Sequence, residues 1–171
     1  MALSDKDILK LMKTGKLKVV PFKKEQLGPA SIDLTLSDEW HFFREEYIGK
    51  TVDLSKKGFK ELTKKIKSKS IILNPGEMCL GKTLEKITLA PDVMGILEGR
   101  SRYARVGLTV HITASVIQPG SNNHQILEIV NLSPLRIVLH AGMQISQMSF
   151  HKLENPTTQP YYKFGKIARR Q

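Results

Sequence analysis

The spacing of the hydrophobic residues changes near the fifteenth position of the chain. Residues 8–12 place four apolar side chains on one helical stripe, behind Ser4 as a candidate N-cap with Asp7 three residues later. Gly15 can end such a helix, because glycine readily adopts the left-handed conformation common at helix C-termini. The pattern therefore predicts a short helix at the N-terminus.

From residue 17 onward the apolar residues recur at the spacing of β-strands. Turn signals at residues 28–29 (GP), 74–76 (NPG) and 119–120 (PG) separate short alternating or apolar runs. The runs occupy residues 17–20, 31–36, 40–43, 70–73, 78–83, 86–89, 94–98, 108–112, 124–132, 136–140 and 143–150. Many short strands without long helical spacers are typical of antiparallel barrels and sandwiches. We expect a mainly β fold, interrupted by a short helix near residues 101–106.

The length and composition favour one soluble domain. A chain of 171 residues can bury its own core, and 40% hydrophobic with 25% charged residues is usual for globular proteins. No apolar run approaches the ~18 residues of a membrane-spanning helix, and the first residues are too polar for a signal peptide. We expect a cytoplasmic protein with one β domain over residues 1–160 and a basic C-terminal segment over residues 161–171.

The charge is strongly positive and unevenly distributed. The chain has 27 Lys and Arg against 16 Asp and Glu, a formal net charge of +11. Residues 56–69 hold seven lysines and one acid, and residues 163–170 hold four basic residues and no acid. Both segments fit a solvated surface, which is our default for residues 56–69. Both also fit attraction of a polyanion, either nucleic acid or the triphosphate of a nucleotide.

The single cysteine narrows the chemistry. Cys79 has no internal disulfide partner, and one cysteine cannot supply the Cys pairs of a structural zinc site or of a zinc deaminase. Its apolar, strand-like context predicts a small buried side chain with a structural role.

The run over residues 124–132 places a carboxylate among apolar side chains. Ile126, Glu128 and Val130 share one face of the predicted strand, and Leu127 and Ile129 share the other. Apolar surroundings disfavour the charged form of a carboxyl group, which suits a general acid or base. The alternative is a structural ion pair with one of the arginines.

Two further features supply polar groups. Gln147 lies in a predicted strand whose other residues are typical of a core. A buried amide needs hydrogen-bond partners, and a flat polar ligand is one candidate. Residues 99–107 (GRSRYARVG) put three arginines and a serine at a strand-to-helix junction. Guanidinium groups, a hydroxyl and backbone N–H groups around one point are suited to binding phosphate.

At these residues the chain resembles the dCTP deaminase and dUTPase superfamily, and most closely its dCTP deaminase branch. The resemblance covers most of the chain, with motifs in the expected order. They are residues 3–8 (LSDKDI), 21–22 (PF), 28–34 (GPASIDL), 74–76 (NPG), 99–107 (GRSRYARVG), 111–114 (HITA), 119–120 (PG), 127–129 (LEI), 142–147 (GMQISQ) and 160–161 (PY).

The resemblance implies a fold, an assembly and a reaction. The fold is a distorted jelly-roll or β-barrel of the dUTPase type, and the assembly is a homotrimer with active sites at subunit interfaces. The substrate is dCTP, or dUTP in the dUTPase branch, with Mg²⁺ held through the triphosphate and no metal ligand on the protein. The deamination needs no zinc, which agrees with the missing cysteine ligands.

The resemblance also assigns roles to individual residues. Glu128 matches the catalytic acid and base, Ser101 and Arg105 match residues that steer the water and the leaving group, and Ala114 keeps space for that water. The nucleotide-binding set is Arg100, Ser101, Arg102, Arg105, Gln118, Ile126, Leu127, Glu128, Gln147, Tyr161 and Lys166. Tyr161 and Lys166 belong to the C-terminal segment, which would close over the triphosphate.

Three positions depart from the family pattern. Gln118 replaces the aspartate usual before Pro-Gly, and an amide can hydrogen-bond a sugar hydroxyl but is a very poor general base. Arg102 replaces a second serine and adds charge near the phosphates. The tail over residues 165–171 (GKIARRQ) lacks the expected Lys-Tyr-x-x-Gln pattern.

Several functions remain open from the sequence. The first is hydrolytic deamination of dCTP to dUTP with release of ammonia. Alternatives on the same fold are a bifunctional enzyme that forms dUMP, a dUTPase alone, and a nucleotide-binding protein without turnover. A nucleic-acid-binding β-barrel ranks below them, because such modules present aromatic side chains on their strands and here the aromatics lie mostly outside the basic segments.

Overall fold

The computed structural model describes residues 2–163 and confirms the N-terminal helix. Helix α1 (Asp5–Lys13) starts with a capping box. The Asp7 N–H donates to Ser4 Oγ at 3.4 Å, and the Ser4 N–H donates to Asp7 Oδ2 at 3.2 Å. The helix buries Ile8 completely, and Leu11 and Met12 pack against the same core. Leu9, the fourth residue of the predicted stripe, is 44% exposed, so the sequence pattern identified the start of the helix and only part of its inward face.

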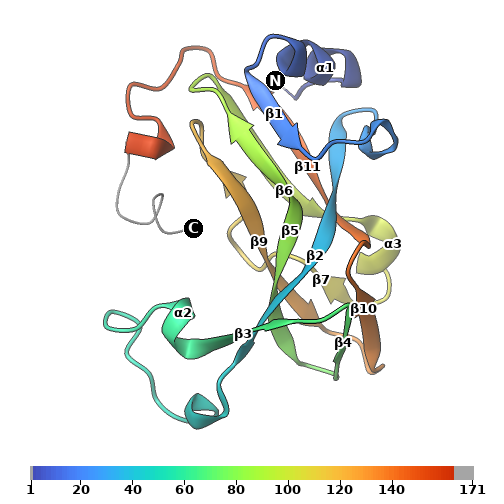
Figure 1. Cartoon of the computed structure of the whole chain (residues 1–171), viewed down its shortest axis with the longest axis vertical. Helices are drawn as coiled ribbons and strands as arrows, with labels where there is room; N and C mark the ends of the chain where they lie inside the picture. Colours follow the sequence, from blue (N-terminus) through green and yellow to red (C-terminus); the bar gives the residue numbers. More distant parts are fainter. Residues whose placement is uncertain (1, 164–171) are drawn as a thin grey trace.

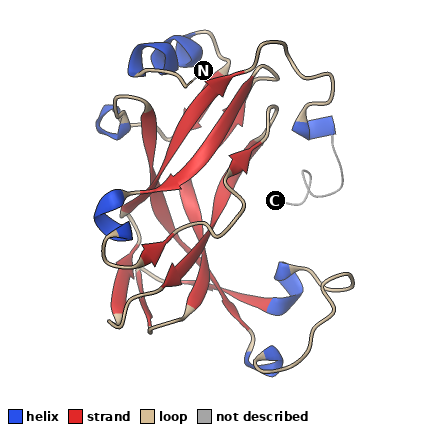
Figure 2. Ribbon diagram, turned by 180° about the vertical axis from the view of Figure 1, so that it is seen from behind, coloured by secondary structure: helices blue, strands red, loops and turns tan. Residues whose placement is uncertain are grey.

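The rest of the described chain is mainly β, as the sequence predicts, and most of its strands belong to one large curled sheet (Figures 1 and 2). The strands are β1 (Leu17–Val20), β2 (Ser31–Phe43), β3 (Thr63–Lys67), β4 (Ser70–Leu73), β5 (Met78–Leu89), β6 (Val93–Gly99), β7 (Leu108–Thr109), β8 (Val116–Ile117), β9 (Asn122–Asn131), β10 (Ile137–His140) and β11 (Gln144–Lys152). The short helices are α2 (Phe59–Leu62) and α3 (Ser101–Ala104), with 3₁₀ turns η1 (Lys24–Gln26), η2 (Glu45–Tyr47) and η3 (Tyr161–Lys163).

The large sheet runs in the order β7-β9-β5-β2-β11-β6-β8, with β1 paired to β5 and β3 paired to β2. Strands β10 and β4 form a separate two-stranded sheet. Every pair is antiparallel. Strand β6 leads into α3, and three strands separate β6 from β9 in the sheet order.

Two of the strands are longer than the sequence predicts. Strand β2 joins the predicted runs at 31–36 and 40–43, and β5 joins those at 78–83 and 86–89. The pairing register shifts between Leu36 and Trp40 and between Lys82 and Lys86. The polar residues that read as turns are therefore irregularities within continuous strands, where an extra residue bends the strand without ending it.

The lysine-rich segment is ordered as α2 and β3. Strand β3 pairs with β2, and Leu62 and Thr63 are buried while the lysines of β3 point outward. Most lysines of residues 56–69 are exposed, which agrees with the solvated surface segment that was our default from the sequence, but the segment is also anchored by two buried residues. Strand β3 has one buried residue in five, so it shows no alternation that the sequence could have revealed.

The core lies inside the curled sheet. Its largest fully buried side chains include Trp40, Phe150, Leu127 and Ile129. Cys79 belongs to this core, and burial raises the pKa of its thiol to about 12, so the structural role predicted for it fits. Within residues 2–163 no helix has both the length and the apolar character needed to cross a membrane.

Candidate active site

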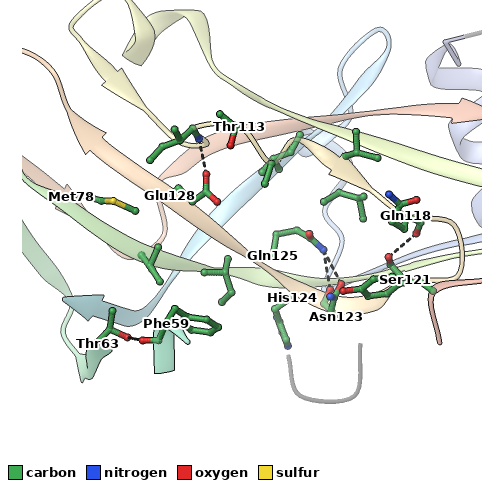
Figure 3. Close-up of a pocket in the computed structure, with 18 of the residues that line it drawn as sticks. Phe59, Thr63, Met78, Thr113, Gln118, Ser121, Asn123, His124, Gln125 and Glu128 are labelled. Atoms are coloured by element: carbon green, nitrogen blue, oxygen red, sulfur yellow. Dashed lines mark hydrogen bonds between the residues drawn. The ribbon is translucent and has the colours of Figure 1, made fainter. Parts of the chain in front are cut away.

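A cavity of about 590 Å³ opens on the side of the sheet formed by β5 and β9 (Figure 3). The loop over residues 112–118 forms one wall. Five residues predicted from the sequence line this cavity: Ala114, Gln118, Ile126, Glu128 and Tyr161. They come from the loop before β9, from β9 itself and, with Tyr161, from a segment more than 30 residues later.

The alternation of β9 decides which side chains reach the cavity. Leu127 and Ile129 are fully buried in the core, whereas Ile126 and Glu128 are half-buried on the opposite face. The two faces are the ones the sequence predicts. Leu127, expected to contact nucleotide, therefore turns its side chain into the core and does not line the cavity.

Glu128 is held by the backbone of the facing loop. The Ile112 N–H donates to Glu128 Oε2 at 2.7 Å, as the dashed line in Figure 3 shows. Of the described residues that line the cavity, Glu128 is the only Asp, Glu, Lys or Arg. Glu128 makes no ion pair with an arginine of residues 2–163, which was the alternative interpretation. The carboxylate is therefore fixed in direction and lies alone in a largely apolar cavity.

The turn beside Gln118 is fixed by a glycine. Gly120 has φ +83°, and a Cβ there would lie 2.7 Å from the Pro160 side chain. This close approach lets the Tyr161 N–H donate to the Pro119 oxygen at 2.8 Å. Gln118 itself is exposed at the cavity, and Tyr161 is brought beside it from the far end of the chain.

The arginine cluster lies elsewhere. Arg100 and Arg102 line a second cavity of about 340 Å³, which shares no lining residue with the first. Ser101 and Arg105 are exposed on and beside α3 and line neither cavity. In Figure 1, α3 lies at the right-hand edge, while the red η3 turn that carries Tyr161 lies at the left. Within one chain, the predicted catalytic groups are thus divided between two places.

Arg100 is fixed by its own strand neighbours. Its Nη2 lies 3.0 Å from Asp33 Oδ2, and its Nη1 donates to the Gln144 carbonyl oxygen at 3.0 Å. Burial raises the pKa of Asp33, and the Arg100 guanidinium opposes that shift. Gln147 is close by but already satisfied, since it donates to the Gly99 oxygen at 3.1 Å and accepts from Ser31 Oγ at 3.2 Å.

Sequence reasoning missed Glu85, which is buried beside this second cavity. The side chain is 1% exposed and lies within the irregular part of β5. Its carboxylate accepts from Gln26 Nε2 at 2.6 Å and from the Thr35 N–H at 2.9 Å. Gln26 Nε2 also donates to the Asp33 oxygen at 2.9 Å, which links Glu85 to the Arg100 partner. The only sign of this site in the sequence was an acidic residue between the apolar runs at residues 78–83 and 86–89.

Other residues of this cavity were given no role from the sequence, although Thr113 lies within the motif at residues 111–114. Thr113, Ser121, Asn123, His124 and Gln125 line the Glu128 cavity, and all lie next to residues that the sequence did single out. Lys166 lies outside the described residues. Within residues 2–163 no group of three or more His, Cys, Asp or Glu side chains is arranged to hold a metal ion.

Comparison with known proteins identifies close relatives. A family model described as dCTP deaminase-like matches residues 2–153. The chain is 38% identical over 168 residues to a protein of Dictyoglomus thermophilum named dCTP deaminase, dUMP-forming, covering 95% of this chain and 86% of that protein. It is 36% identical over 170 residues to a protein of the same name from Methanopyrus kandleri, covering 93% and 86%.

Solved structures share the fold. A deoxycytidine triphosphate deaminase from Agrobacterium tumefaciens aligns with TM-score 0.67 at 24% identity, covering 88% of this chain and 47% of that one, so this chain spans about half its length. A dUTPase of Staphylococcus bacteriophage 80alpha aligns with TM-score 0.51 at 14% identity, covering 87% and 98%. These likenesses confirm the dUTPase-like β fold expected from the sequence.

Proposed function

Since the chain belongs to the dCTP deaminase-like family, we propose that it deaminates dCTP and hydrolyses the deoxyuridine nucleotide to dUMP. The sequence alone favoured dUTP as the final product and kept dUMP formation as an alternative. The names of the relatives favour that alternative, since those from Dictyoglomus thermophilum and Methanopyrus kandleri are called dUMP-forming. The observation that carries the deamination is the carboxylate of Glu128, alone in its cavity and directed by the Ile112 N–H.

In the deamination, Glu128 transfers the protons. The carboxylate takes a proton from water while the water oxygen attacks C4 of cytosine, which gives a tetrahedral centre. Glu128 passes this proton to ring nitrogen N3, then takes the proton of the new C4 hydroxyl and delivers it to the amino nitrogen. The C4–N bond breaks, ammonia leaves, and the water oxygen remains as the C4 carbonyl of uracil. Ala114 leaves room for this water at the cavity wall.

The phosphate-binding groups come from a second subunit in this proposal. The Glu128 cavity has no arginine or lysine among its described lining residues, while Arg102 and Arg105 are exposed elsewhere. A homotrimer in which α3 of one subunit meets the Glu128 cavity of the next would complete the site. Exposed apolar side chains near α3 support such a contact, namely Val106, Leu132 and Leu135, which are 50–68% exposed.

Magnesium enters as part of the substrate. We treat the nucleotide as its Mg²⁺ complex, with the ion bound by phosphate oxygens, because the described residues offer no ligand set of their own. Arg100, Ser101, Arg102 and Arg105 would then meet the remaining phosphate charge. A zinc-free reaction and a cytoplasmic location remain part of this proposal.

Gln118 favours a second candidate function. Formation of dUMP requires water to attack the α-phosphorus and the bond to the departing pyrophosphate to break. The Gln118 amide can position a water molecule but cannot take its proton near neutral pH. This observation favours an enzyme that stops at dUTP, the end product that the sequence alone favoured.

One assay separates these functions. The protein is incubated with Mg²⁺ and either dCTP or dUTP, the nucleotides are resolved, and ammonia and pyrophosphate are quantified. We expect ammonia, pyrophosphate and dUMP from dCTP. Ammonia with accumulating dUTP would select the second candidate. Cleavage of dUTP without ammonia from dCTP would indicate a dUTPase alone, and dCTP binding without any product would refute both enzymatic proposals.

A further inference from the structure

A third cavity, of about 390 Å³, adjoins the Glu128 cavity and is lined by lysines. Lys60, Lys65 and Lys82 come from α2, β3 and β5. Four residues form walls of both cavities: Phe59, Thr63, His124 and Ile126. Figure 3 shows three of them, Phe59, Thr63 and His124, along the lower edge of the Glu128 cavity. We call this third space the lysine cavity.

The lysine cavity has more positive charge than its own carboxylate balances. Glu39 is the only acid in its described lining, and its oxygens lie 3.4 Å from Lys65 Nζ and 3.5 Å from Lys82 Nζ. Lys60 Nζ lies 5.9 Å from the centre of the Phe59 ring. Lys65 and Lys82 share this one carboxylate, which leaves an excess of positive charge in a partly enclosed space.

The imidazole of His41 does not offset the positive charge of the lysines. His41 lies 3.9 Å from Glu39, and burial followed by the neighbouring lysines outweighs that carboxylate and lowers the pKa of the imidazole. The side chain of Lys82 is only 29% exposed, so water screens its charge less than it screens a free surface lysine. The shared positive charge of Lys65 and Lys82 therefore makes the cavity complementary to an anion.

We propose that the lysine cavity binds phosphate groups of a polyphosphate anion. This inference gives Lys65 and Lys82 a role that the proposed reaction does not use. The anion is either the polyphosphate of a nucleotide whose base occupies the adjoining cavity or free pyrophosphate, and both have the same chemistry. The site lies beside the proposed nucleotide site, but its test does not depend on turnover.

The direct test is lysine footprinting. The full chain is acetylated briefly with and without inorganic pyrophosphate at constant ionic strength, and the modification of each lysine is measured by mass spectrometry. We expect pyrophosphate to protect Lys65 and Lys82 at least ~3-fold. Lys6 and Lys18, exposed on α1 and β1, serve as internal controls and should change little. Equal labelling of Lys65 and Lys82 with and without pyrophosphate would overturn the proposal.

A pair of variants tests whether the two lysines contribute to the affinity for pyrophosphate. K65Q/K82Q removes both charges and keeps the length of the side chains, and K6Q/K18Q is the matched control. Calorimetry with pyrophosphate should show ~10-fold weaker binding for the first and a change below ~2-fold for the second. Equal weakening in both would overturn the proposal.

Titration of the same variants with dCTP then shows whether the bound phosphates belong to a nucleotide or to free pyrophosphate. A ~10-fold loss in K65Q/K82Q would indicate the nucleotide's own phosphates, and unchanged dCTP binding with weakened pyrophosphate binding would indicate the free anion. Either result supports a polyphosphate site. If the protein releases no ammonia from dCTP, the proposed function fails while the footprint still decides this inference.

Discussion

The Ile112 backbone N–H and the Glu128 carboxylate are joined by a 2.7 Å hydrogen bond across the cavity. Loop 112–118 and β9 are separate in sequence, so this contact fixes the only ionic side chain in the described lining relative to the opposite wall. A carboxylate that transfers protons must be held within about hydrogen-bond distance of the reacting water. The contact is therefore a direct requirement of the proposed chemistry.

Removing this hydrogen bond should slow catalysis. Ile112→Pro deletes the donor N–H, and we expect kcat for ammonia release to fall ~10-fold or more because Glu128 loses its orientation. Ile112→Ala is the matched control, since it retains the N–H and trims a side chain that is 53% exposed. Its kcat should stay within ~3-fold of the original. Similar losses in both variants would show that the side chain and not the hydrogen bond matters.

The two-subunit site predicts complementation. Glu128→Gln and Arg105→Gln chains should each be inactive alone, because each lacks one half of every site. The two variants are mixed in equal amounts, unfolded together and refolded. About one quarter of the original ammonia release should return, because about one quarter of the interfaces then combine an intact Glu128 with an intact Arg105. Refolding each variant alone is the control. Absence of recovery despite mixed trimers would refute sites shared between subunits.

Gln118 controls phosphate cleavage in this account. Gln118→Asp supplies a carboxylate that can accept a proton from water, so pyrophosphate release from dUTP should rise by ~10-fold or more. Gln118→Asn shortens the side chain without adding a base and should produce no such rise. An unchanged rate of pyrophosphate release in the aspartate variant would show that another group already activates the water.

The buried Glu85 should contribute to stability. Glu85→Ala leaves the Gln26 amide and the Thr35 N–H without their acceptor inside the protein, a loss of ~3 kcal/mol in the free energy of unfolding. Glu154→Ala, at an exposed position, should change it by less than ~0.5 kcal/mol. Urea unfolding measures both. A Glu85→Ala value near that of the control would mean that water replaces the lost contacts.

Local sequence patterns predicted the parts of the fold that depend on local geometry. The helix cap at Ser4 follows from local hydrogen-bond geometry, and the two faces of β9 follow from strand alternation. Both features could therefore be predicted from a few neighbouring residues. The irregularities in β2 and β5 were not, because a polar residue within a bulge looks like a turn until the partner strand is known.

The division of the site could not be read from local sequence. The arginine cluster and Glu128 are near each other in the chain, and that nearness favoured a single site. The sheet order instead separates β6 from β9 by three strands, so residues that follow β6 lie apart from the Glu128 face. Long-range strand pairing decides this arrangement. Glu85 escaped notice for the same reason, since Gln26 and Thr35 lie at least 50 residues away.

The central claim is that Glu128 transfers the protons of deamination, and Glu128→Gln tests it most directly. The amide keeps an acceptor for the Ile112 N–H but cannot exchange protons as a carboxylate does. We predict that ammonia release from dCTP is abolished while the Kd for dCTP stays within ~10-fold of the original, because the group acts on the transition state more than on binding. Ammonia release at the original rate in this variant would contradict the account.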